Sequence, residues 1–182
     1  MITVTTTTIT FRDLSSKTRG MQGRYVLLTI MALAFFACGN EDDEPKVPVS
    51  EQDKNFSLNA SYSNLAEISM GQLALSEGND PFVREFGEMM VTDHTNVQDQ
   101  LANLAESNDI AISDTLKTEQ QILYDQLSIL EGLAFDSTYI NSQILAHQEA
   151  QQIFQTQIDQ GQHPQLVEFA SITLPHINMH LG

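Results

Sequence analysis

The stretch DPFVREFGEMMVTDHTNVQDQLANL, residues 80–104, carries the clearest fold signal in the chain. Its apolar positions recur every three or four residues, as they do on the inner face of a helix in a bundle. These positions are Phe82, Phe86, Met90, His94, Val97, Leu101 and Leu104. Asp80 and Pro81 supply an N-cap and a first-turn proline. We therefore predict a long helix that ends near Ser107 and carries His94 in its buried seam.

The same period continues on both sides of this stretch, and no segment after residue 55 shows the alternation typical of a strand. We predict further helices over residues 55–77, 118–131, 136–160 and 164–181, with Asp136 as an N-cap and Gly132 as a stop. The fold class that follows is all-α. We expect a four-helix bundle with an additional short helix in the crossover between the second and third long helices.

Histidines occur on several of the apolar faces. His147 lies at the centre of its helix stripe, and His176 and His180 are four residues apart on one helix face, which we expect to point inward. A metal ion can satisfy several buried imidazoles at once. Glu67 lies on a face of small residues in the first helix, and if it also binds the ion, every long helix contributes a ligand. We predict a single transition-metal ion, Zn or Fe, held by Glu67, His94, His147, His176 and His180.

A structural alternative remains open for the same residues. Core histidines can be satisfied by hydrogen bonds to Asp93, to Asn178 or to one another, and Glu67 can be an exposed carboxylate. His163 precedes a proline in a predicted loop, so we expect it at the surface.

The first 54 residues are predicted to be a targeting segment and a tether. Residues 1–20 are threonine-rich and without pattern, so we expect the native start at Met21 and a non-native or extended N-terminus before it. Residues 21–37 join one cation to an apolar run too short to span a bilayer, and they end at Cys38, the one cysteine of the chain. This predicts a lipoprotein signal peptide, lipidation of Cys38 and an acidic tether over residues 38–54.

The charge of the chain limits its partners. The net charge is −16, and after Cys38 the cations are Lys46, Lys54, Arg84 and Lys117 alone, so the sequence offers no basic patch for nucleic acid. The expected membrane partner is the bilayer that holds the lipid anchor. The acidic cluster at residues 41–44 resembles the surface-export signal of Bacteroidota lipoproteins, and a plain acidic linker is the alternative. We therefore expect an outer-membrane lipoprotein of the cell envelope, periplasmic or surface-exposed.

Five sequence elements together resemble a known family. They are Glu67-Ile68 with Gly71, Met-Val-x-Asp-His at 90–94, Phe135-Asp136-x-x-Tyr139, His147, and Leu174-Pro175-x-x-x-x-His180. Over about residues 55–181 the chain is similar to the bacterial family called domain of unknown function 4142. The resemblance implies a ferritin-like four-helix bundle in the outer membrane or periplasm, and that grouping suggests metal binding.

One departure from ferritin chemistry is visible in the sequence. Di-iron sites of ferritin-like proteins use Glu-x-x-His motifs. Here the residues three positions before the candidate histidines are Val91, Ile144, Thr173 and Ile177. A mononuclear, histidine-rich site therefore fits the sequence better than a pair of bridged irons.

Two classes of function follow from these observations. The first is a lipid-anchored cell-envelope bundle that binds a metal ion for storage, buffering or stress protection. The second is a non-enzymatic structural or interaction module of the envelope whose core histidines are purely structural. The sequence contains no nucleophile motif, phosphate-binding loop or paired catalytic carboxylates, so it gives an enzyme no positive support.

Overall fold

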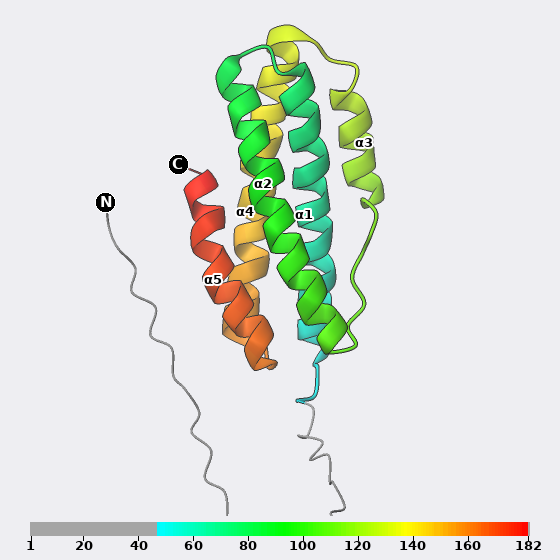
Figure 1. Cartoon of the computed structure of the whole chain (residues 1–182), viewed down its shortest axis with the longest axis vertical. Helices are drawn as coiled ribbons and strands as arrows, with labels where there is room; N and C mark the ends of the chain where they lie inside the picture. The colour runs from blue at the N-terminus through cyan, green and yellow to red at the C-terminus, as the bar shows by residue number, and fades with distance from the viewer. Residues whose placement is uncertain (1–46, 182) are drawn as a thin grey trace, which may run out of the picture. The chain divides into compact units, whose positions relative to one another are not determined.

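The computed structural model describes residues 47–181, which form five α-helices and no strand. The helices are α1 (Glu51–Glu77), α2 (Pro81–Ser107), α3 (Thr118–Leu127), α4 (Gly132–Gln160) and α5 (Pro164–His180). In Figure 1, α1, α2, α4 and α5 lie side by side, and the short α3 lies beside α1 in the connection from α2 to α4. The prediction of an all-α fold is confirmed. The predicted signal peptide, Cys38 and most of the tether lie outside the described residues.

No helix among residues 47–181 combines the length and the apolar character needed to span a bilayer.

Two helices begin earlier than the sequence suggested. A capping box starts α1 at Glu51, four residues before the predicted start, because the side chains and backbone amides of Ser50 and Asp53 bond reciprocally. Gly132, predicted as a stop, is the first residue of α4 and adopts a φ of +60°, which glycine tolerates. Asp136 is therefore a residue inside α4, and its prediction as an N-cap of this helix is wrong.

Asp136 instead closes the turn between α1 and α2. Its carboxylate accepts hydrogen bonds from the backbone amides of Asn79 (2.8 Å) and Asp80 (2.9 Å). The sequence reading of Asp80 and Pro81 as the start of α2 is confirmed, because the Asp80 side chain accepts from the Phe82 amide.

Asp53 does the same at the turn between α4 and α5. It is fully buried and accepts from Gln157 Nε2 (2.7 Å) and from the backbone amides of Gln162 (3.1 Å) and His163 (3.2 Å). Burial would raise the pKa of Asp53, but hydrogen bonds from Ser50, Gln157 and His163 outweigh it and lower the pKa to about 2. The expectation of a surface His163 is wrong. The hydrogen bonds to Asp53 hold this turn against the bundle, and His163 is 2% exposed.

Small residues bring α1 and α2 into close contact. A Cβ on Gly71 would lie 2.8 Å from the Gly87 carbonyl oxygen, and a Cβ on Gly87 would lie 2.7 Å from that of Gly71. The small-residue face of α1 is consequently the buried one, and Glu67 on it is 2% exposed. The apolar positions Leu58, Tyr62, Leu65 and Ile68 are only half-buried.

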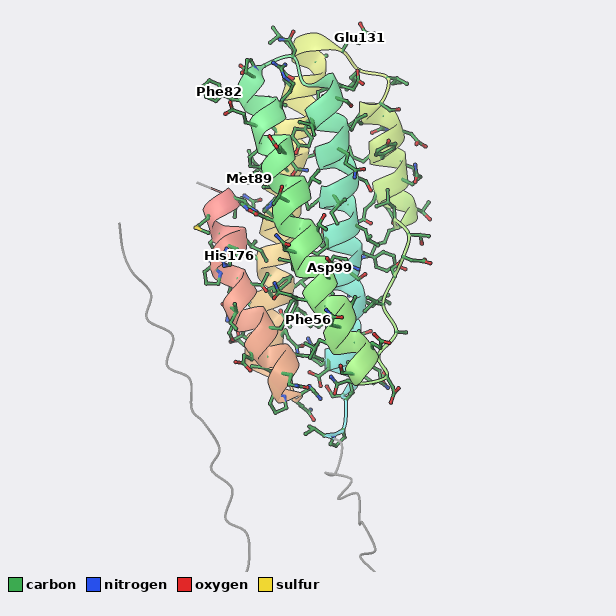
Figure 2. The ribbon with its side chains drawn as sticks, viewed as in Figure 1. Phe56, Phe82, Met89, Asp99, Glu131 and His176 are labelled. Atoms are coloured by element: carbon green, nitrogen blue, oxygen red, sulfur yellow. The ribbon has the colours of Figure 1, made fainter. Side chains whose placement is uncertain are left out.

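The apolar core consists of two clusters. One contains Phe56, Leu101, Phe154, Leu166 and Phe169, and the other contains Met70, Leu127, Phe135 and Tyr139. Phe82, predicted in the α2 seam, is 77% exposed near the end of α2 next to the α1–α2 turn (Figure 2), so that seam begins one turn later. Along α4, Tyr139 belongs to one cluster and Phe154 to the other, with His147 between them. The buried polar side chains around His147 thus form a layer between the two apolar clusters.

Candidate metal centre

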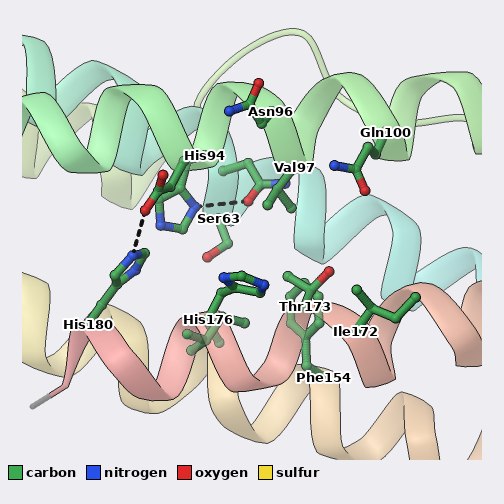
Figure 3. Close-up of a pocket in the computed structure, with 14 residues that line it drawn as sticks. Ser63, His94, Asn96, Val97, Gln100, Phe154, Ile172, Thr173, His176 and His180 are labelled. Carbon is green, nitrogen blue, oxygen red and sulfur yellow. Dashed lines mark hydrogen bonds and ion pairs between the residues drawn. The ribbon is translucent and has the colours of Figure 1, made fainter.

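Three histidines from three helices meet in this polar layer. His94 of α2, His147 of α4 and His180 of α5 each offer one ring nitrogen, and the three nitrogens lie within 4.8 Å of one another. His94 is 5% exposed, His147 is 1% exposed and the side chain of His180 is 6% exposed. Figure 3 shows His94 and His180 facing each other across the space between α2 and α5.

The opposite nitrogen of each ring has a hydrogen-bond acceptor. His147 Nδ1 lies 2.9 Å from the backbone oxygen of Gln143, and His180 Nε2 lies 3.0 Å from Asp93 Oδ2. Neither a carbonyl nor a carboxylate oxygen donates a hydrogen bond, so these two nitrogens carry the hydrogen. His94 Nδ1 lies 3.0 Å from Asn64 Oδ1.

The Asn64 side chain is itself oriented by its neighbours. Its Nδ2 donates to Gln98 Oε1 (3.3 Å), and Gln98 Nε2 donates in turn to the Ser61 hydroxyl (3.0 Å). The amide oxygen of Asn64 therefore faces His94, which donates from Nδ1. Metal-binding histidines are commonly held in this way, with the outer nitrogen bonded to an oxygen and the inner nitrogen free to bind.

The inner nitrogens are left with unshared lone pairs. His147 Nε2 and His180 Nδ1 are 3.1 Å apart, and His94 Nε2 is buried with no hydrogen-bond partner among the described residues. Two lone pairs repel at that distance unless a second proton or a cation lies between them. Two nitrogens bound to one tetrahedral Zn²⁺ at about 2.0–2.1 Å are separated by roughly 3.3 Å. The His147–His180 spacing is close to this value, and the inner nitrogen of His94 lies within 4.8 Å of both.

Burial keeps two of these imidazoles neutral. It lowers the pKa of His94 to about 3, with a further contribution from the positive charge that His147 and His180 could carry. Burial also lowers the pKa of His147. Neutral imidazole is the form that binds a metal ion, so these two residues are ready to bind at neutral pH.

Glu67 lies on the outer side of His147. Its Oε1 is 3.8 Å from His147 Nδ1, the nitrogen directed away from the other histidines. Burial raises the pKa of Glu67 to about 8 although the nearby Gln143 side-chain amide opposes the shift, so the carboxyl is mostly protonated at neutral pH. Glu67 Oε2, both polar atoms of the Gln143 side chain and the Tyr139 hydroxyl are buried, and none of them forms a hydrogen bond of regular geometry. The structure thus places Glu67 behind a histidine rather than among the converging nitrogens.

His176 is also outside the group, and its side chain is exposed. The buried face of α5 runs through Phe169, Thr173 and Ile177, and His180 continues it three residues after Ile177. His176 directly precedes Ile177 and is rotated away from this face by about 100°. The expectation that it points into the core is therefore wrong.

Comparison with known proteins identifies the family of the chain. The family described as Domain of unknown function (DUF4142) matches residues 39–182. The chain belongs to this family. No curated protein matches the DUF4142 chain.

Solved structures of another family share the fold of this DUF4142 protein. A DUF305 fragment from Deinococcus radiodurans has a TM-score of 0.66 and 13% identity, covering 74% of this chain and 93% of the fragment. A DUF305 protein from Streptomyces coelicolor, described as secreted, has a TM-score of 0.61 and 11% identity, with coverages of 71% and 85%. At such identities the likeness shows the fold alone.

A cavity of about 180 Å³ adjoins the histidines of the DUF4142 domain. His94, His180 and Asp93 line it at one end, and Val97, Phe154 and Thr173 line it further along (Figure 3). His176 lies along the same cavity on α5. Sequence reasoning gave no ligand-orienting role to Asn64 or to the Gln143 carbonyl, but it named Asp93 as a possible hydrogen-bond partner of the core histidines, and the structure contains the Asp93–His180 contact. The sole local signal for Asn64 was its position one turn before Glu67 on the small-residue face of α1.

Proposed function

We propose that the protein is a lipid-anchored helical bundle of the cell envelope that binds one transition-metal ion through His94, His147 and His180. The observation that carries the proposal is the arrangement of the three rings. Each outer nitrogen has an oxygen acceptor within hydrogen-bond distance, and the three inner nitrogens lie within 4.8 Å of one another. A purely structural set of histidines would pair a donor with an acceptor at the His147–His180 contact, which the orientation of these rings does not provide without a further proton.

The donor set favours a divalent ion of borderline softness. Three neutral imidazoles suit Zn²⁺, and iron or copper are the next candidates, since no thiolate is among the ligands. Asp93 strengthens the donor character of His180 in the manner of a carboxylate–histidine–metal arrangement. A single ion per chain suits buffering or stress protection better than bulk storage.

The location and the finer architecture belong to the same proposal. A lipid on Cys38 would tether the domain to the outer membrane, and the description of the Streptomyces coelicolor structure as secreted supports an envelope protein. We assign the helices to a ferritin-like four-helix bundle of α1, α2, α4 and α5. The position of α3 in the connection from α2 to α4 supports an additional helix in the crossover.

Metal analysis of purified residues 39–182 tests the proposal. The expected result is close to one equivalent of Zn or Fe, or one equivalent of Zn taken up by chelator-treated protein in calorimetry. His94→Ala, His147→Ala and His180→Ala should each weaken Zn binding by about two orders of magnitude or more. Protein that neither retains a metal nor changes its melting temperature with Zn or Fe would refute the proposal.

His176→Ala is the matched control. It removes an imidazole from the same helix, one turn from His180, but outside the converging group. We expect its Zn affinity to equal that of the unaltered protein. Equal losses from His176→Ala and His180→Ala would contradict the assigned ligand set and favour the four-histidine site that the sequence suggested.

A further inference from the structure

The three-histidine site has no fourth His, Cys, Asp or Glu ligand within residues 47–181. The group of candidate ligands that lie within 4.8 Å of one another contains His94, His147 and His180 alone. Asp93 contacts His180 on the outer nitrogen, and Glu67 lies behind His147, so neither carboxylate reaches the converging side. A tetrahedral ion held here keeps one open position, as catalytic zinc sites do and closed structural sites do not.

The open position faces the cavity. His94 and His180 both line the cavity, whereas His147 is buried and is not part of the lining. The cavity continues between α2 and α5 to the surface, because Asn96, Gln100 and Ile172 line it and are exposed. These two helices make few contacts with each other, so the groove between them is not filled by packing.

The size and charge of the space define the ligand. A cavity of about 150 Å³ can hold benzene, so the 180 Å³ found here admits a molecule of similar size. A divalent ion on three neutral imidazoles, with Asp93 as the one carboxylate in the lining, leaves an uncompensated positive charge. Such a charge in a partly buried site favours an anionic ligand. The Ser63 hydroxyl, the Asn96 amide and the His176 ring line the same space and can donate hydrogen bonds to it.

We propose that the cavity between α2 and α5 is the binding site for a small monodentate anion that completes the coordination of the metal held by His94, His147 and His180. This inference rests on the metal site proposed above. It adds that the bound ion is accessible and exchanges its fourth ligand through the cavity.

Cobalt substitution separates the two proposals in one experiment. The full-length protein is purified, stripped of metal and titrated with Co²⁺, whose visible absorption bands report tetrahedral coordination by the histidines. Sodium azide, acetate and naphthoate are then added to the Co²⁺ protein. We expect azide and acetate to change the bands saturably and naphthoate, which is larger than the benzene-sized space, to do so only at much higher concentration.

Filling the cavity provides the matched variants. Val97→Phe places a larger side chain in the lining at a residue that is not itself a ligand and should weaken azide binding by about tenfold or more. It should leave Co²⁺ affinity unchanged. Val167→Phe makes the same change on α5 outside the cavity and should alter neither affinity.

The outcomes distinguish the claims. Tetrahedral Co²⁺ bands that no anion alters would overturn this inference and leave the metal site standing. Absence of Co²⁺ bands would overturn both. Azide binding unaffected by Val97→Phe, or naphthoate acting as well as acetate, would place the anion outside this cavity. The size series on the unaltered protein decides the question even where the phenylalanine variant fails to fold, which circular dichroism would reveal.

Discussion

Glu67→Gln should stabilise the metal-free protein at neutral pH. Glu67 is 2% exposed, and its pKa is raised from 4.5 to about 8 because burial disfavours the charged carboxylate. The unfolded chain ionises this residue from about pH 4.5 upward, whereas the folded chain keeps it protonated to about pH 8. Glutamine has nearly the same shape as the protonated acid and cannot ionise in either state.

The magnitude follows from linkage. A group whose pKa is raised by folding contributes its full stability below the unfolded pKa and loses it as the pH rises through the folded pKa. At pH 7 the difference is about 2.5 pH units, and at about 1.4 kcal/mol per unit Glu67 costs roughly 3 kcal/mol relative to pH 4. The gain from Glu67→Gln should therefore be near zero at pH 4 and grow to a few kcal/mol at pH 7–8.

Urea unfolding followed by circular dichroism, with a chelator present and over pH 4 to 8, measures this difference. Glu88→Gln removes a carboxylate from the exposed side of α2 and serves as the control for the general effect of net charge, which is −16. A Glu67→Gln variant that is less stable than the parent at pH 7, or whose advantage does not grow with pH, would refute the reasoning. A large loss of Zn affinity in this variant would show that Glu67 is a ligand after all.

Three further predictions concern the fold around the site. Asp53→Asn should lower the free energy of unfolding at pH 7 by about 2–3 kcal/mol, because it weakens charge-assisted hydrogen bonds to the α4–α5 turn. In chemical denaturation, this difference from the parent should disappear as the pH falls from 3.8 towards 2, where Asp53 of the parent becomes protonated. Gly71→Ala should destabilise by about 2 kcal/mol or more, because its Cβ would meet the Gly87 carbonyl oxygen at 2.8 Å, and thermal melting would reveal it. Phe154→Ala should lower the free energy of unfolding by about 3–5 kcal/mol in urea, because it truncates a core side chain. Added Zn should stabilise this variant and the parent by the same amount, so the difference between them should not change.

The all-α fold could be predicted from the sequence because helical periodicity is local. The spacing of apolar residues in 80–104 and the Asp80-Pro81 start require only neighbours along the chain, and the structure contains that helix at Pro81–Ser107. Helix boundaries and turns that depend on contacts with other helices were not predicted correctly. Asp136 and Asp53 cap turns 56 to 110 residues away in the sequence, and no local pattern reveals such partners.

The histidine group was only partly accessible to the same reasoning. Periodicity placed His94 and His147 on inner faces, but it could not separate His176 from His180, because residues four apart differ by only about 40° around a helix. The rotation of α5 is set by Thr173 and Ile177, which turn His180 inward and leave His176 exposed. Base rates also favoured an exposed Glu67. Its burial follows from the close approach of α1 and α2 at Gly71 and Gly87, a contact between helices rather than a property of one.

The position of the histidines explains why a bound ion should matter for the fold as well as for function. They lie between two apolar clusters, where unpartnered polar atoms are costly, and His94 Nε2 has no partner in this layer. An ion that binds the folded chain and not the unfolded one stabilises it by RT ln(1 + [L]/Kd), or about 4 kcal/mol at a thousandfold excess over Kd. That gain is similar in size to the destabilisation we expect from Glu67 at neutral pH. On the proposal that the three inner nitrogens share one ion, we infer that the polar layer weakens the metal-free bundle and that the bound ion offsets this cost.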